Sequence, residues 1–144
     1  MSADRRGAEH ELQKLGSAVA DSTGPPFHVS IRAGRHSLSA DEPESVGGGN
    51  TGAGPFSLLM SALGACTAIT LRMYADRKGW PLEAVHVRLV YRSEDVRVPG
   101  EVQREIRLDG PLDETQRAKL ADIAERTPVT KVVKAAVDVR TTMR

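Results

Sequence analysis

The segment from Pro55 to Lys78 constrains the fold more than any other part of the chain. Its apolar residues recur at three- and four-residue spacing, and one such stripe contains Leu59, Leu63, Cys66 and Met73. This spacing predicts a long helix. Because apolar residues also occupy its other faces, we expect a central helix with the rest of the fold packed around it.

Both ends of this helix are marked in the sequence. Pro55 suits the first turn, where a missing backbone N–H leaves no hydrogen bond unmade. Arg77 and Lys78 favour the negative end of the helix, and Gly79 can take the left-handed conformation that terminates it. Serine, threonine and glycine interrupt the apolar run. We therefore expect it to fall short of the ~20 apolar residues of a membrane span and to be buried in protein.

Alternating apolar and polar residues predict strands on both sides of this helix. They are expected over Phe27–Arg32, Arg35–Ala40, Ala84–Arg92, Val102–Leu108 and Ala136–Thr142. The first two flank a tight turn at Ala33-Gly34, and the next two are close in sequence, so each pair predicts an antiparallel hairpin.

Two shorter helices are expected near the C-terminal end. Asp113-Glu-Thr-Gln116 is a capping-box pattern, which opens a helix that Thr127-Pro128 interrupts. The same threonine can cap the next helix, which we expect over Pro128–Lys134. Glu9–Leu15 could form one further short helix, within a weakly structured segment 1–26. The order of elements, with its hairpins, predicts an α+β fold in a single domain, 1–144.

Composition excludes several classes of function. The net charge is +1 and only 3% of the residues are aromatic, so neither an electrostatic field nor stacking platforms for nucleic acid are expected. A lone cysteine makes no internal disulfide, and residues 1–10 contain no apolar run typical of a secretory signal. We therefore expect a cytoplasmic protein.

No cofactor or metal ion is expected. The four histidines are far apart in sequence and show no metal-ligand spacing. The glycine-rich loop 47–54 lacks the lysine and serine of a phosphate-binding loop, so nucleotide binding is not expected. Its glycines indicate instead a backbone in unusual dihedral angles, or one that another group approaches closely.

Three blocks in this order resemble the OsmC/Ohr family of osmotically inducible and organic hydroperoxide resistance proteins. They are Asp41-Glu-Pro with Gly47-Gly48, then Gly54-Pro55 leading through Leu58-Leu-Met-Ser-Ala-Leu-Gly-Ala-Cys66 to Trp80, and Ala124-Glu-Arg-Thr-Pro-Val129. The resemblance spans about Phe27 to Thr142. It implies an α+β fold with an antiparallel sheet packed on the long central helix, and an intertwined homodimer.

The resemblance also implies thiol peroxidase chemistry in the oxidative stress response. Cys66 matches the family's cysteine that attacks an organic hydroperoxide. In the family a second cysteine resolves the sulfenic acid, while an arginine and a glutamate set the thiolate and orient the peroxide. Arg35, on the first predicted hairpin with Arg32, is the candidate for that arginine, although we favour a solvated charge on a strand as its explanation.

The chain departs from the family pattern at two of these four groups. Thr127-Pro128 stands where the family has the Cys-Pro step of the resolving cysteine, and the position of the glutamate maps near Ser57. Thr130 stands where a histidine is frequent. A sulfenic acid without a partner thiol must therefore react with a thiol from outside or oxidise further.

Two hypotheses follow for the lone cysteine. Thiolates react and thiols do not, and a free cysteine with a pKa of about 8.5 is only a few per cent ionised at neutral pH. In the first hypothesis a nearby cation favours the thiolate, and the protein reduces organic hydroperoxides with an external thiol as reductant. In the second, Cys66 is an inert core residue, and the protein binds a small apolar ligand at a dimer interface without catalysis.

Overall fold

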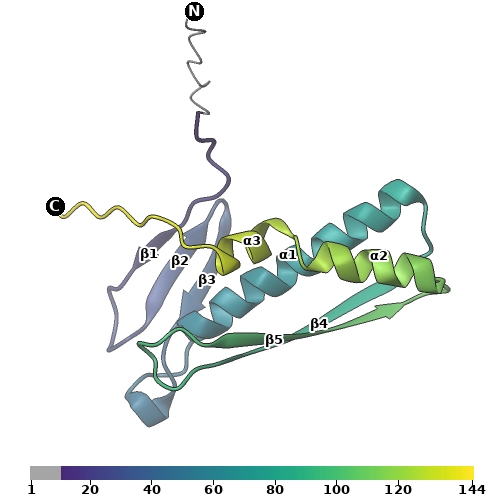
Figure 1. Ribbon diagram of the computed structural model, residues 1–144. Coiled ribbons are helices and arrows are strands. Elements are labelled where there is room, and N and C mark those ends of the chain that lie inside the picture. Colours follow the sequence, from purple (N-terminus) through teal and green to yellow (C-terminus); the bar gives the residue numbers. More distant parts are fainter. Residues whose placement is uncertain (1–10) are drawn as a thin grey trace, which may run out of the picture. The chain divides into compact units, whose positions relative to one another are not determined.

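The computed structural model describes residues 11–144, and these residues belong to two compact units. One unit ends at Gly54 and the other runs from Pro55 to Arg144. Each unit contains an antiparallel sheet and at least one helical segment, which confirms the predicted α+β class (Figure 1). The single domain over residues 1–144 stays a prediction.

The N-terminal unit is built on a three-stranded antiparallel sheet. Its strands are β1 (Val19–Asp21), β2 (Val29–Ala33) and β3 (His36–Ala40), in the order β1-β2-β3. The predicted hairpin is confirmed: Ala33 pairs with His36, and Gly34 takes a φ of 62° in the turn between them.

The segment before this hairpin contains a strand that the sequence pattern did not indicate. β1 has only three residues, too few to show a period of two, and it forms by pairing with β2. The expected helix Glu9–Leu15 lies partly outside the described residues, and residues 11–15 form no helix. A short 3-10 helix, η1 (Glu44–Val46), follows β3.

The C-terminal unit consists of one long helix, a two-stranded ladder and two shorter helices. These are α1 (Pro55–Lys78), β4 (Ala84–Arg92), β5 (Glu101–Asp109), α2 (Glu114–Ala124) and α3 (Pro128–Lys134). α1 lies along β4 and also contacts α2 and α3 (Figure 1). The β4–β5 ladder is antiparallel and pairs Ala84 with Asp109 at one end and Arg92 with Glu101 at the other.

The ends of the helices confirm the sequence signals. Gly79 has a φ of 67°, and the Trp80 N–H donates to the Ala75 carbonyl, which ends α1. At α2, the Asp113 carboxylate accepts from the Gln116 N–H, and the Gln116 side chain accepts from the Asp113 N–H. Thr127 takes the N-cap position of α3, but its hydroxyl bonds to Thr130 rather than to a backbone N–H.

One face of α1 forms the core of this unit. Its buried residues are Met60, Leu63, Thr67, Leu71 and Ala75. Leu71 and Ala75 pack with Leu120 and Ala124 of α2 and with Leu82, which follows α1.

The opposite face of α1 is uncovered, so the expectation of burial on nearly all sides is wrong for the single chain. Leu59, Ile69 and Met73 are 44%, 58% and 57% exposed. Two strands and two short helices are too few to surround a helix of 24 residues.

By length and composition alone, α1 is also able to cross a membrane. Its most apolar window of 18 residues has a mean hydropathy of 1.5, so the expectation that its composition falls short was wrong. Core helices of water-soluble proteins satisfy the same criterion. The prediction of a protein-buried helix rests instead on the packing of α1 against β4, α2 and α3.

The predicted last strand, Ala136–Thr142, is absent from the described chain. Residues 135–144 are exposed and have no strand assignment. The alternating pattern is real, because Val137 and Val139 are two residues apart, but a strand also needs a partner for its backbone hydrogen bonds. None of the described strands pairs with this segment.

Candidate functional site

Cys66 lies in the middle of α1 and is half-buried. The Val129 N–H, in the first turn of α3, donates to its Sγ with an N···S distance of 3.4 Å. The Thr70 hydroxyl lies 3.9 Å from the same sulfur. The sulfur is therefore neither sealed in an apolar core nor fully in water, and one backbone donor is directed at it.

Two threonines flank Val129, at positions where the family resemblance predicts a resolving cysteine and, frequently, a histidine. Thr127 and Thr130 are both buried, and their hydroxyl oxygens are 2.6 Å apart in a shared hydrogen bond. The Thr127 carbonyl accepts from the Lys131 N–H, which closes the first turn of α3. A threonine at position 127 is therefore compatible with the first turn of α3.

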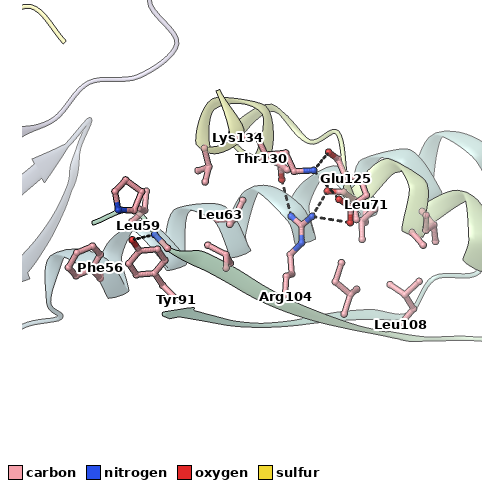
Figure 2. A pocket seen from close by; sticks show the side chains of 18 of the residues that line it. Phe56, Leu59, Leu63, Leu71, Tyr91, Arg104, Leu108, Glu125, Thr130 and Lys134 are labelled. Atoms are coloured by element: carbon pink, nitrogen blue, oxygen red, sulfur yellow. Dashed lines mark hydrogen bonds and ion pairs between the residues drawn. The ribbon is translucent and has the colours of Figure 1, made fainter. Parts of the chain in front are cut away.

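A buried arginine connects the elements around Cys66. The side chain of Arg104, on β5, is only 11% exposed. Its Nη1 donates to the Thr67 hydroxyl at 3.0 Å and to the Thr130 hydroxyl at 2.9 Å. Its Nη2 donates to the Ala124 carbonyl at 2.8 Å and lies 3.7 Å from a carboxylate oxygen of Glu125. Figure 2 shows this guanidinium pointing from β5 toward α3.

Glu125 joins this arginine to a second cation. The Lys134 ammonium donates to its carboxylate at 3.0 Å and to its backbone carbonyl at 3.4 Å. The hydrogen bond and charge of Lys134, with a smaller contribution from Arg104, hold the pKa of Glu125 below its usual value. The carboxylate therefore stays ionised at neutral pH and holds the C-terminal end of α3 to the end of α2.

An apolar cavity of about 940 Å³ opens beside these charged groups (Figure 2). Its walls come from Leu59 and Leu63 of α1, Val102 and Ile106 of β5, Leu120 of α2 and Val133 of α3. Arg104, Glu125 and Lys134 also line it, whereas its lining, drawn from residues 56–134, does not include Cys66. The cavity suits an apolar group with a polar end.

The other residues predicted for the site lie elsewhere. Arg35 is exposed in the turn between β2 and β3, in the N-terminal unit, and its role at the sulfur stays a prediction. Ser57, near which the resemblance places the family's glutamate, is exposed in the first turn of α1, where its carbonyl accepts from the Ser61 hydroxyl. Ser57 supplies no carboxylate that could replace the glutamate.

The N–H groups of the glycine-rich loop bond to a carboxylate of the protein itself, that of Asp41. The buried Asp41 carboxylate accepts from the N–H groups of Gly49 and Thr51 and from the Thr51 hydroxyl. A Cβ at Gly48 would lie 1.9 Å from the Glu42 carbonyl oxygen, so only glycine fits there. These N–H groups are thus occupied by Asp41. Within residues 11–144, His, Cys, Asp and Glu side chains form no group of three or more that could hold a metal ion.

The sequence pattern drew attention to Cys66, whose role stays a prediction, and did not draw attention to Arg104. The signal was present, because Arg104 interrupts an inward-facing register of β5 that otherwise holds Val102, Ile106 and Leu108. An arginine in that register must find buried partners, since an unpaired buried charge is costly. Its partners lie on three other elements, and no local pattern predicts such long-range pairs.

Solved structures with the same fold include three informative relatives. A candidate osmotic stress induced and detoxification response protein of Psychrobacter arcticus 273-4 is 19% identical, with a TM-score of 0.72 over 83% of this chain and 89% of its own. A candidate organic hydroperoxide resistance protein of Vibrio cholerae, with captopril bound in one of its active sites, is 19% identical, with a TM-score of 0.63 over 92% and 93%. The organic hydroperoxide resistance protein OhrB of Bacillus subtilis is 18% identical, with a TM-score of 0.55 over 88% and 96%.

No curated protein sequence matches the chain. The sequence model of one family does match, and that family is described as OsmC-like protein. The match covers residues 47–142, which include the glycine-rich loop, all of α1 with Cys66, and the threonines of α3. With a match over most of its length and the same fold in solved relatives, the chain belongs to the OsmC-like family.

Proposed function

We propose that the protein is a thiol peroxidase of the oxidative stress response, which reduces organic hydroperoxides through Cys66 and uses an external thiol as reductant. The observation that carries the proposal is the hydrogen bond from the Val129 N–H to the Cys66 sulfur. A donor directed at a sulfur stabilises its anion more than its neutral form, and the anion is the nucleophile. Solved relatives described as organic hydroperoxide resistance proteins support the substrate class.

The first step oxidises the sulfur. The Cys66 thiolate attacks the outer oxygen of the hydroperoxide, an S–O bond forms, and the O–O bond breaks. The leaving alkoxide takes a proton and departs as the alcohol, which leaves a sulfenic acid on Cys66. The sulfur is oxidised by two electrons and the peroxide is reduced by the same two.

The second step needs a thiol from outside, because the chain has a single cysteine. An external thiolate attacks the sulfenic sulfur, an S–S bond forms, and water leaves. A second external thiol then attacks the mixed disulfide, which releases a small disulfide and returns the Cys66 thiol. The sum is one hydroperoxide and two thiols converted to an alcohol, water and a disulfide.

The uncovered face of α1 supports a homodimer. Ile69 and Met73 are mostly exposed in the single chain, and a second copy would remove them from water. As the residue that orients the peroxide we propose Arg35 of the N-terminal hairpin. The working environment would be a reducing cytoplasm, which supplies the external thiol.

The alternative function is binding without catalysis, and the apolar cavity favours it. A volume of about 940 Å³ is large enough for a small apolar ligand. The polar end of such a ligand could reach Lys134, which lines the same cavity. In this case Cys66 would be a structural residue, and no oxidation of its sulfur would be required.

One experiment separates these functions. The purified protein is treated with cumene hydroperoxide and dimedone, which traps sulfenic acids, and the adduct at Cys66 is measured by mass spectrometry. We expect one adduct per chain and consumption of hydroperoxide when a thiol is supplied, with neither in Cys66→Ser. A native protein whose Cys66 gains no adduct and consumes no hydroperoxide supports the binding function instead.

A second variant tests the missing sulfur. Thr127→Cys places a thiol two residues before Val129, whose N–H touches Cys66. We expect hydroperoxide to produce an internal disulfide in this variant and dimedone trapping to fall. An oxidised variant that keeps the full dimedone adduct and no disulfide contradicts this arrangement of the site.

A further inference from the structure

We propose that Arg104 is a positioning residue for Cys66: it holds α3 against α1 so that the Val129 N–H stays on the sulfur. This inference rests on the proposed function of Cys66. Arg104 is bonded to Thr67, the residue after Cys66, and to Thr130, the residue after Val129. Nη1 of Arg104 therefore bonds to the residue that follows each side of the N–H···S contact: Thr67 follows Cys66, and Thr130 follows Val129.

The hydrogen atoms around Arg104 can be assigned from the partners. The Thr67 hydroxyl donates to the Leu63 carbonyl at 2.7 Å, so its oxygen is free to accept from Arg104. Nη1 carries two hydrogens and faces two hydroxyl oxygens, one on α1 and one on α3. Nη2 faces the Ala124 carbonyl and the Glu125 carboxylate, at the end of α2. Three hydrogen bonds and one ion pair of the guanidinium thus meet at one junction.

A lysine could not make the same set of contacts. Its ammonium has three donors around a single nitrogen, whereas the guanidinium is a rigid fork with two terminal nitrogens. The positive charge alone would favour a thiolate nearby, but only the fork also fixes α3 relative to α1. Arg104→Lys therefore keeps the positive charge and removes the fork of donors. Arg104→Met removes both the charge and the fork and keeps an unbranched side chain.

The test measures how fast iodoacetamide alkylates Cys66 between pH 5 and 10, with the native protein and without any peroxide. Thiolates are alkylated and thiols are not, so the midpoint of this pH profile reports how strongly the site favours the anion. We expect Arg104→Met to slow the alkylation of Cys66 at neutral pH about tenfold, because the N–H···S contact that favours the thiolate is loosened. Arg104→Lys should fall between Arg104→Met and the wild type.

Arg117 offers a matched control. It lies on α2 and donates to the Leu108, Gly110 and Leu112 carbonyls, so it also fixes a junction through several bonds. None of these bonds reaches Thr67 or Thr130. Arg117→Met should lower the melting temperature and leave the pH profile of Cys66 unchanged, whereas a profile shifted equally in both methionine variants would overturn a specific role for Arg104.

Thr130 keeps the inference testable even where Arg104→Met does not fold. Thr130→Val keeps the shape but removes the hydroxyl that accepts from Arg104, and Thr130→Ser keeps that hydroxyl. We expect the valine variant to shift the profile in the same direction and the serine variant to restore it. Folded Arg104 or Thr130→Val variants with a wild-type profile refute the inference. Because no peroxide is present, that result is independent of whether the protein is a peroxidase.

Discussion

Thr127 is the residue at which the family resemblance predicts a change of chemistry, and the structure shows how a threonine fits there. Its hydroxyl pairs with Thr130, its carbonyl closes the first turn of α3, and Pro128 begins that helix. Because threonine and cysteine side chains are similar in size, we expect the same local backbone with either residue at position 127. The resemblance predicts that what the chain lacks here is the family's second sulfur, and with it an internal disulfide.

The loop before α1 depends on a single carboxylate, which predicts a loss of stability in acid. The Thr51 hydroxyl, followed by the N–H groups of Thr51, Glu42 and Gly49, holds the pKa of Asp41 below its ordinary value of 3.8. Because the folded-state pKa is the lower one, the carboxylate stabilises the fold above pH 3.8. That stability is lost as the pH falls through the lowered folded-state pKa.

Asp41→Asn tests this prediction through melting temperatures between pH 2 and 7. We expect the variant to melt lower than the wild type at neutral pH, because its amide N–H₂ cannot accept from the N–H groups of the loop. The difference should shrink in acid, where the wild-type carboxyl is also protonated. Glu44→Gln, on the exposed η1, is the control and should keep the wild-type dependence. An equal deficit at every pH would contradict the prediction.

At the scale of single residues, the sequence shows which residue types are unusual, but it does not show which distant residues they contact. Cys66 stood out because it is the only cysteine in the chain. Thr127 stood out because it precedes Pro128 where the family resemblance predicts a cysteine before that proline. Arg104 did not stand out, since its importance arises from Thr67 and Thr130, which are 37 and 26 residues away. The role of Arg35 stays a prediction.

Among the elements, α2 begins at a capping box that is visible in the sequence, so the contribution of this cap to stability can be measured by itself. Asp113 accepts from the Gln116 N–H at 2.8 Å, and its own N–H donates to the Gln116 side chain at 3.0 Å. We expect Asp113→Ala to lower the free energy of unfolding by about 1 kcal/mol, as for other N-caps. Urea denaturation followed by circular dichroism measures it.

The neighbouring Glu114 serves as the control for this cap. It is exposed in the first turn of α2, and it takes no part in the capping box. Glu114→Ala should change the free energy of unfolding by no more than about 0.5 kcal/mol. Equal effects of the two substitutions would mean that charge near the helix end, and not the capping bonds, stabilises α2.

Elements with local signals were predictable, and elements that need a distant partner were not. α1, α2 and α3 begin at capping or helix-starting residues that are visible in the sequence, and α1 and α2 also end at such signals. The β2–β3 and β4–β5 hairpins follow from alternation across short connections. β1 was missed and the strand at 136–142 was wrongly expected, because pairing with another strand decides whether such segments form strands.

At the scale of the whole molecule, the exposed face of α1 predicts an association that one substitution can weaken. Ile69 is mostly exposed, so Ile69→Lys should leave the single chain folded. In the proposed homodimer the same substitution places a charge in an apolar interface and should raise the dissociation constant about tenfold or more. Light scattering during size exclusion, over a range of concentrations, measures it.

Val96→Lys is the matched control for the interface. Val96 is an exposed apolar residue in the connection between β4 and β5, away from the stripe on α1. It should leave the mass in solution unchanged. A wild-type protein that is monomeric at every concentration would show that α1 remains uncovered by a second copy.

The junction at Arg104 limits how this sequence can vary. A chain that replaces this arginine by an apolar residue leaves the hydroxyls of Thr67 and Thr130 buried without their donor. Losing either hydroxyl alone leaves the guanidinium with an unused hydrogen in a buried place. Positions 67, 104 and 130 are therefore expected to change together among related sequences, even though they belong to three different elements and are far apart along the chain.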